Sequence, residues 1–220
     1  MIIENMGGAM EHWLGFQDKI GRSFMMNEDA LKYPLADYLV NDGSINIKYI
    51  DLEKPHPNFS NRLVDVSVFD STNRTLNNVF ELKLAKSTTR NQSEKQRIFN
   101  DLMRLHLANI VTRDKCYFII TGKSTNFQRD FIEFPNTGSS FYKKWFDFVK
   151  GQSLTFDVAT ETDNDYLSIY QMFINKYSST YQGTGTNILQ LPNQITTKCE
   201  FITGFKATLV PYMTGIWSVS

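Results

Sequence analysis

The sequence lacks the features that define several large classes of protein. It has two cysteines, Cys116 and Cys199, which are too few for a disulfide framework, so we expect both to be buried thiols in a reducing, cytoplasmic setting. No apolar run approaches the ~18 residues that a membrane-spanning helix needs, and no membrane partner is expected. The first residues contain no basic stretch followed by an apolar one, so no signal peptide is expected.

Histidines are scarce, and the chain has no net charge. The three histidines lie far apart in the sequence, and no Cys/His spacing indicates a zinc site. Lys and Arg together number 23, as do Asp and Glu, so the chain as a whole has no charge excess that would attract a polyanion. Hydrophobic residues make up 41% of the 220 residues, which predicts one folded domain, 1–220, with a substantial core.

The charges are nevertheless unevenly distributed. Residues 82–129 contain ten Lys and Arg against three acidic residues, whereas the remainder contains thirteen basic and twenty acidic residues. Clustered positive charge favours a nucleic-acid partner, because each neutralised phosphate releases condensed counterions. Lys86, Arg90 and Lys95 are the expected phosphate contacts. A charged helix surface without any partner explains the same clustering equally well.

Two strand-like runs contain the residues that are best suited to catalysis or metal binding. Residues 62–69 alternate branched apolar residues with others and include Asp65, and residues 79–85 return after a turn-rich segment with Glu81 and Lys83. Residues i and i+2 of a strand share a face, so a hairpin would bring all three side chains together. Two carboxylates suit a hard divalent cation, and a neighbouring ammonium can orient a water molecule. The ordinary alternative is a solvated cross-strand ion pair.

The periodicity of the other segments predicts an α/β protein. The first forty residues read as helical, with Asn27 as the cap of a helix that begins at Glu28. Residues 45–52 and 115–121 read as further strands, the second buried on both faces. Ser93 and Gln96 match a capping box at the start of a helix over 93–110. Its core face is marked by apolar residues at helical spacing, namely Ile98, Phe99, Leu102, Leu105 and Ile110.

Polar residues on that helix and beyond it have ordinary explanations. Asp101 is predicted to form a surface pair with Arg97 or Arg104. Helices are expected near 127–134, 141–149 and 165–177, a hairpin between 201–202 and 206–212, and a closing strand at 215–219. The tyrosines of the last helical segment could stack on bases, although their spacing favours one packed helix face; they are Tyr166, Tyr170, Tyr177 and Tyr181.

The order of these residues and elements resembles the PD-(D/E)xK nuclease superfamily. The resemblance rests on Asp65, Glu81 and Lys83 within the series helix, three-strand meander, helix, strand, and it covers about residues 28–123. Val64 precedes Asp65 where the family pattern has proline. The resemblance implies a restriction-endonuclease-like core, a central mixed β-sheet flanked by helices, with a C-terminal α+β elaboration over about 124–220. It also implies metal-dependent hydrolysis of phosphodiester bonds, with DNA as the expected substrate.

The same resemblance implies roles for individual residues. Asp65 and Glu81 would bind Mg²⁺ or Mn²⁺ with the carbonyl of Leu82, and Lys83 would position the attacking water. Glu28 and Gln96 are possible accessory residues, although helix-dipole complementarity and capping explain them too. A homodimer is compatible with this picture.

Two other functions fit the sequence. One is a catalytically silent nuclease-like fold that serves as a nucleic-acid or protein interaction module. The other is an unrelated α/β binding protein in which the motif is a coincidence.

Overall fold

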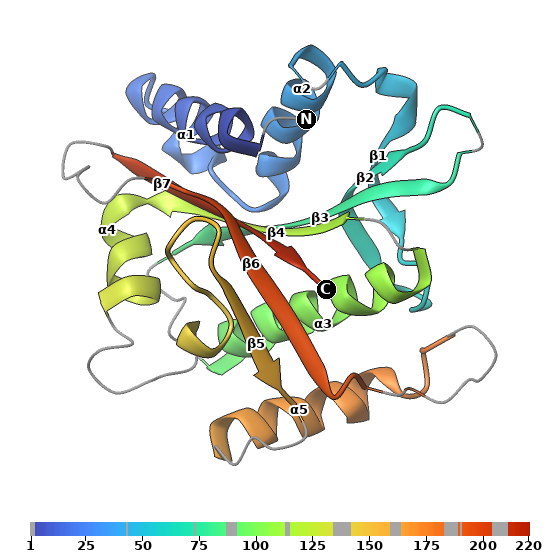
Figure 1. Ribbon diagram of the computed structural model, residues 1–220. Helices are drawn as coiled ribbons and strands as arrows, with labels where there is room; N and C mark the ends of the chain where they lie inside the picture. The colour runs from blue at the N-terminus through green and yellow to red at the C-terminus, as the bar shows by residue number, and fades with distance from the viewer. Residues whose placement is uncertain are drawn as a thin grey trace.

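A seven-stranded mixed β-sheet runs through the centre of the molecule, in the order β1-β2-β3-β4-β7-β6-β5 (Figure 1). The strands are β1 (Ile50–Pro55), β2 (Leu63–Phe69), β3 (Leu76–Ala85), β4 (Lys115–Lys123), β5 (Ser153–Asp157), β6 (Gln194–Ile202) and β7 (Tyr212–Val219). Only the β3–β4 pair is parallel among these pairings. The computed structural model describes residues 3–42, 44–72, 74–86, 92–112, 115–133, 142–158, 164–182, 189, 191–203 and 211–220.

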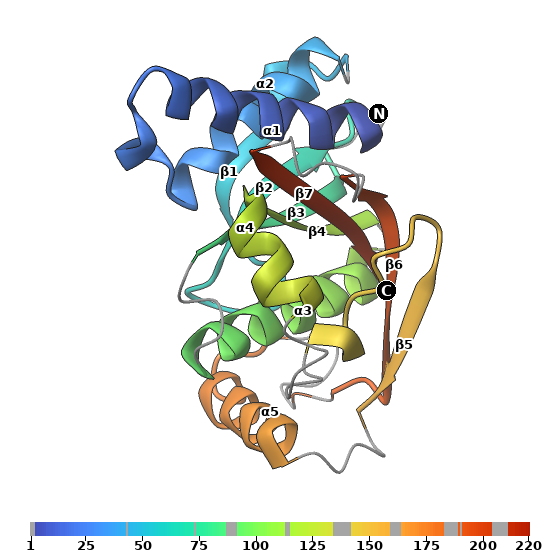
Figure 2. The same cartoon turned by 90° about the vertical axis from the view of Figure 1, so that its left-hand side faces the viewer.

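Helices cover both faces of this sheet. In Figures 1 and 2, α1 (Ile3–Lys19) and α2 (Lys32–Asn41) lie on one side, and α3 (Gln92–Thr112) and α5 (Asn164–Tyr177) lie on the other. A short α4 (Ser124–Phe127) continues into the π-helical η4 (Gln128–Glu133). Four 3₁₀ turns complete the described elements: η1 (Ser23–Met25), η2 (Asp29–Leu31), η3 (Ile47–Tyr49) and η6 (Tyr142–Lys144). No helix in the described ranges is long and apolar enough to cross a membrane.

The alternation of β3 determines which side the functional side chains face. Phe80 and Leu82 belong to the core beneath α1 and α2, whereas Val79 and Ala85 belong to the core beneath α3 and α5. Glu81 and Lys83 therefore point toward α3, because successive side chains alternate across a strand. The polar residues of β3 therefore face α3, which packs against this strand on that side.

The predicted hairpin and the helix after it are confirmed. β2 and β3 pair in antiparallel fashion with Val66 opposite Phe80, and α3 follows before β4. The predicted core face of α3 is buried at Ile98, Phe99, Leu102 and Leu105. The side chain of Ile110 lies outside the described residues. Both cysteines are buried, and no disulfide joins them.

Three local predictions are wrong, two of them because hydrogen bonds redirect the chain. Residues 47–49 form a 3₁₀ turn, since the Asn46 side chain accepts the Lys48 N–H at 3.1 Å, and the strand is 50–55. Ser93 lies inside α3, which already includes Gln92, so it is not the N-cap. Of the described residues 142–149, only Tyr142–Lys144 is helical, because the Asp147 side chain accepts the Val149 N–H and its carbonyl accepts the Trp217 indole N–H.

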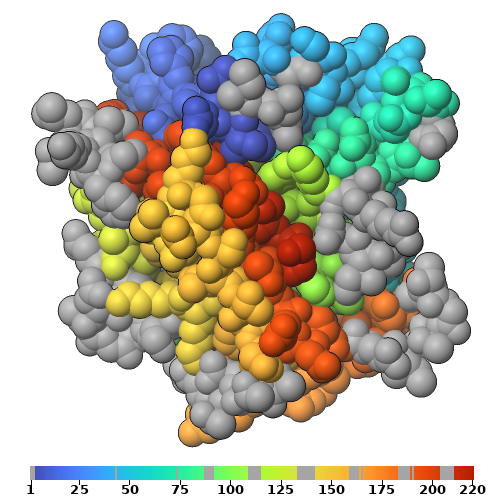
Figure 3. Space-filling model, in the orientation of Figure 1, coloured from blue at the N-terminus to red at the C-terminus, as the bar shows by residue number. Residues whose placement is uncertain are grey.

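The C-terminal half contributes to the same sheet. β7 pairs with β4 on one side and β6 on the other, so it continues the sheet from the first half of the chain. In Figure 3 this gold-to-red segment occupies the middle of the visible face, below the blue N-terminal helices. β5 was not predicted, β6 is longer than expected, and residues 206–210 of the predicted hairpin lie outside the described residues.

The tyrosines of α5 belong to the core. Tyr166 and Tyr177 are fully buried, and Tyr170 and Tyr181 pack against the same core. Their rings contact neighbouring aromatic residues, such as Phe99. The packed helix face is confirmed for the three tyrosines of α5, whereas Tyr181 lies beyond the end of that helix.

Gly122 tests the close approach of β3 and β4 beside the polar face. A Cβ at this position would lie 2.8 Å from the carbonyl oxygen of Ala85. Gly122→Ala should therefore lower the free energy of unfolding by about 1–3 kcal/mol, because backbone atoms must move. Gly8→Ala in α1, where a Cβ would meet no atom within 4 Å, should raise it by about 0.5–1 kcal/mol. Urea unfolding measures both, and a fully stable Gly122→Ala protein would contradict this packing.

Candidate functional site

The site lies where β2 and β3 separate. Their pairing is described from Val66–Phe80 toward the turn, and beyond this pair the Asp65 carboxylate accepts the Leu82 N–H at 2.8 Å. The Asp65 side chain thus replaces the backbone carbonyl that would accept this N–H in a regular β-sheet. The N–H and C=O of one strand residue point to the same side, so the Leu82 carbonyl faces the same gap.

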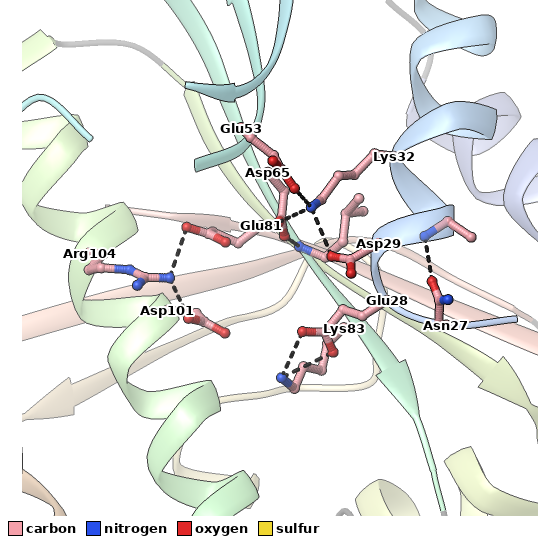
Figure 4. Close-up of polar contacts among 12 residues, drawn as sticks. Asn27, Glu28, Asp29, Lys32, Glu53, Asp65, Glu81, Lys83, Asp101 and Arg104 are labelled. Carbon is pink, nitrogen blue, oxygen red and sulfur yellow. Dashed lines mark hydrogen bonds and ion pairs between the residues drawn. The ribbon is translucent and has the colours of Figure 1, made fainter. Parts of the chain in front are cut away.

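Glu81 lies beside Asp65 and is held from α3. The Glu81 side chain is almost fully buried, and its carboxyl lies close enough to Asp65 for each to shift the pKa of the other. The Arg104 guanidinium lies 3.2 Å from Glu81 Oε1 and 2.6 Å from Asp101 Oδ1 (Figure 4). Arg104 therefore joins a strand carboxylate to a helix carboxylate in the interior.

Lys32 forms a second group of ion pairs around Asp65. Its Nζ lies 2.8 Å from Glu53 Oε1, 3.0 Å from Asp29 Oδ1 and 3.5 Å from Asp65 Oδ1 (Figure 4). Glu53 has a φ of +54°, a conformation that costs a non-glycine residue about 1–3 kcal/mol. The edge strand β1 contains this strained residue at the point where its carboxylate reaches Lys32.

Lys83 is held by carboxylates from two other segments. Its Nζ lies 3.1 Å from Glu28 Oε2 and 3.5 Å from Glu94 Oε2, and the residue is only 3% exposed. The Asn27 side chain accepts the Ala30 N–H at 2.8 Å, as a capping side chain does, although the chain here forms the 3₁₀ turn η2 and α2 begins only at Lys32. This bond fixes the turn from which Glu28 projects. The predicted accessory acid Glu28 thus lies in the site, paired with Lys83.

Carboxylates outnumber cations in this cluster. Seven acidic side chains take part in the contacts above, against the three cations Lys32, Lys83 and Arg104. Arg97, on the outer rim, lies 2.8 Å from Glu94. With Arg97 included, the carboxylates still outnumber the cations by three. The acids are Glu28, Asp29, Glu53, Asp65, Glu81, Glu94 and Asp101. The group therefore attracts an additional positive charge or proton.

The pKa shifts follow from this imbalance. Burial raises the pKa of Glu81 well above its ordinary value; the Arg104 guanidinium offsets part of this rise, and the nearby Asp65 and Asp101 add to it. Burial likewise raises the pKa values of Asp65 and Asp101. For Lys83, burial alone would lower the pKa, but the surrounding carboxylates, Asp101 first, raise it overall. Lys83 consequently stays protonated near neutral pH.

The site offers a magnesium-like cation two carboxylates as ligands. Among the residues that the structure describes, no three His, Cys, Asp or Glu side chains converge on one point as metal ligands. Asp65 and Glu81 are adjacent, and the Leu82 carbonyl faces the same gap. Mg²⁺ commonly binds through one or two carboxylates and retains several waters. These residues therefore suit a partly hydrated hard cation, provided that Lys32 and Arg104 give way.

Of the three predicted nucleic-acid contacts, one is exposed, one is buried and one lies outside the described residues. Lys86 is exposed at the end of β3, whereas Lys95 is 8% exposed and so does not contribute to an exposed basic face. Arg90 lies outside the described residues. Lys83 and Arg104, which added to the basic excess of residues 82–129, also point inward. Gln96 is half-buried on α3 and takes no part in the ion pairs above.

The sequence interpretation missed six residues of the site. Asp101 pairs with Arg104, one of its two predicted partners, but this pair is largely buried and not on the surface. The other five were not considered as site residues; they are Asp29, Lys32, Glu53, Glu94 and Arg104. A signal was present on α3: Glu94 and Asp101 are seven residues apart and Arg104 follows three later, which aligns them beside the apolar face.

Comparison with known proteins finds no relative. No family model, curated protein or solved structure matches this chain. Its function is therefore argued from the geometry and charge of the site alone.

Without divalent cations, stability should fall as the pH rises. The folded state raises the pKa values of Glu81, Asp65 and Asp101, so it binds more protons than the unfolded state above about pH 4. The free energy of unfolding then decreases through the window between the ordinary and the raised values. Glu81→Gln should flatten this decrease, so that the free energy of unfolding of the variant increases relative to that of wild type as the pH rises above the ordinary range of a carboxyl group.

Urea unfolding in chelator at several pH values measures this effect. Glu4→Gln, on the exposed face of α1, is the control and should behave as wild type. If the pH dependence of stability in Glu81→Gln equals that of wild type, Glu81 is not the carboxyl whose raised pKa causes the decrease.

Proposed function

We propose that this chain is a metal-dependent nuclease of the PD-(D/E)xK type that hydrolyses phosphodiester bonds, with DNA as its substrate. The observation that carries the proposal is the adjacent pair Asp65 and Glu81 in the gap between β2 and β3, with Lys83 on the same face. The antiparallel β1-β2-β3 meander, followed by α3 and the parallel β4, supports a restriction-endonuclease-like core.

Asp65 and Glu81, together with the Leu82 carbonyl, would hold Mg²⁺ or Mn²⁺. The bound cation would neutralise charge on the transferring phosphoryl group and acidify a water molecule. Without it, Arg104 and Lys32 compensate the same carboxylates. Cation binding therefore competes with these internal pairs, and the excess of carboxylates favours it.

Lys83 would act on the water and the phosphate. Its ammonium is compact, buried and protonated, and Glu28 and Glu94 fix its position. A fixed positive charge beside a developing phosphorane stabilises the transition state more than the ground state. Lys83 lies 3.1 Å from Glu28, so this acid orients the ammonium.

A second function has its own support. All three central residues already have internal counter-ions, Lys32 for Asp65, Arg104 for Glu81 and Glu28 for Lys83. A site compensated in this way can persist without a metal, and the chain would then be a silent nuclease-like module that binds nucleic acid or protein. Divalent-cation binding separates the two functions.

Cleavage assays on single- and double-stranded DNA and RNA test the proposal. With Mg²⁺ or Mn²⁺, Asp65→Asn and Glu81→Gln should each lower cleavage by at least about a hundredfold, because each removes a charge that acts in the transition state. Lys83→Ala should lose cleavage but retain metal binding, and Lys83→Arg should restore little, since a planar fork replaces a compact ammonium.

The matched control is Glu200→Gln on β6, which should cleave as wild type. Mg²⁺ or Mn²⁺ should also raise the melting temperature of wild type but not of Asp65→Asn. Cleavage that survives Glu81→Gln would contradict the site, and the absence of any metal-dependent stabilisation would favour the interaction module.

A further inference from the structure

A cavity of about 420 Å³ opens at the ends of β3 and β4, just beyond the candidate site. We call it the strand-end pocket, and its polar lining is Lys86, Lys123 and Asn126. Its apolar wall comes from Leu84, from Met26 near the end of η1, and from the Tyr212 ring at the start of β7. The parallel β3–β4 pair brings both lysines to one end of the sheet.

The strand-end pocket lies within reach of a substrate held at Lys83. Lys86 follows Lys83 by three residues, roughly 10 Å at the rise of a β-strand, and its side chain leaves the opposite face of the sheet. Met26 of the pocket lies two residues before Glu28, whose carboxylate contacts Lys83. The pocket and Lys83 are thus joined around the end of β3, where neighbouring nucleotides of one strand can reach both. The pocket lies at the ends of the inner strands β3 and β4 and the start of β7, whereas Asp65 lies on the β2 side of β3.

The lining matches the two parts of a nucleotide. Lys86 and Lys123 are both exposed and present ammonium groups, which bind phosphate as point charges. The Tyr212 hydroxyl donates to Met26 Sδ at 3.5 Å, so the apolar wall is held in place. A flat, largely apolar base fits such a wall, and the Asn126 amide lies beside it with a long contact of 3.5 Å to the Ala85 carbonyl.

We propose that the strand-end pocket binds one unpaired nucleotide next to the scissile phosphate, which makes single-stranded or locally unpaired nucleic acid the preferred substrate. This inference rests on the proposed function. A base within a duplex cannot enter a pocket that admits one nucleotide, because it must first leave its stack and its partner. Selectivity for unpaired strands then follows from the shape of the pocket.

Binding of a 5′-phosphorylated thymidine dinucleotide, measured by calorimetry without divalent cations, is the first test. Lys123→Gln should weaken binding by about tenfold, the effect of losing one charge-assisted contact. Lys115→Gln makes the same change at the opposite end of β4 and should leave binding within about twofold of wild type. Equal effects at both lysines, or none at Lys123, would overturn the assignment.

Cleavage kinetics are the second test. Wild type should cleave a single strand in preference to the matched duplex, and Lys123→Gln should raise the KM for the single strand with a smaller change in kcat. A preference for duplex that Lys123→Gln does not alter would overturn the proposal.

The two proposals fail in different ways. If cleavage depends on Glu81 while Lys123→Gln leaves dinucleotide binding unchanged, the nuclease proposal stands and the strand-end pocket is refuted. If no cleavage occurs but Lys123→Gln weakens dinucleotide binding, the pocket stands and the nuclease is refuted.

Discussion

The site depends on the compensation of buried carboxylates. Glu81 and Asp101 share the Arg104 guanidinium, and this contact joins β3 to α3 in the interior. Removing one partner of such a buried group leaves uncompensated charge, at a cost of about 3–5 kcal/mol. The positions of β2, β3 and α3 around the gap are therefore tied to one another electrostatically as well as by the apolar core.

This arrangement is more than stability alone requires. Buried ion pairs can often be replaced by well-packed apolar residues without loss, so a network in which acids outnumber bases needs another explanation. The strained backbone at Glu53 and the separation of β2 from β3 beside Asp65 occur at the same place. Strain and unbalanced charge that coincide in one gap are typical of a site that binds a cation or a substrate.

Local patterns predicted the part of the site that lies on neighbouring strands. Asp65, Glu81 and Lys83 were found because strand alternation and one short turn determine their relative positions. Lys32, Glu53 and Arg104 escaped because their roles depend on tertiary contacts between segments far apart in the sequence. Asp101 was predicted on the surface for a related reason. An acid three or four residues from an arginine gives the same sequence pattern whether that face of the helix is buried or exposed.

The fold shows the same division. The β2–β3 hairpin, α3 and β4 followed from periodicity, and so did α5. β5 and most of β6 were missed because their alternation is weak, with several polar residues such as Thr155 and Thr196 in register. Side-chain hydrogen bonds to the backbone, at Asn46 and Asp147, redirected segments that composition alone favoured as strand or helix.

The central claim is that Asp65 and Glu81 together form a divalent-cation site, and calorimetric titration with Mn²⁺ tests it most directly. The account predicts that wild type binds one Mn²⁺ per chain, that Glu81→Gln and Asp65→Asn each abolish this binding, and that Glu200→Gln retains it. The absence of Mn²⁺ binding to folded wild type, or binding that survives both substitutions, would contradict it.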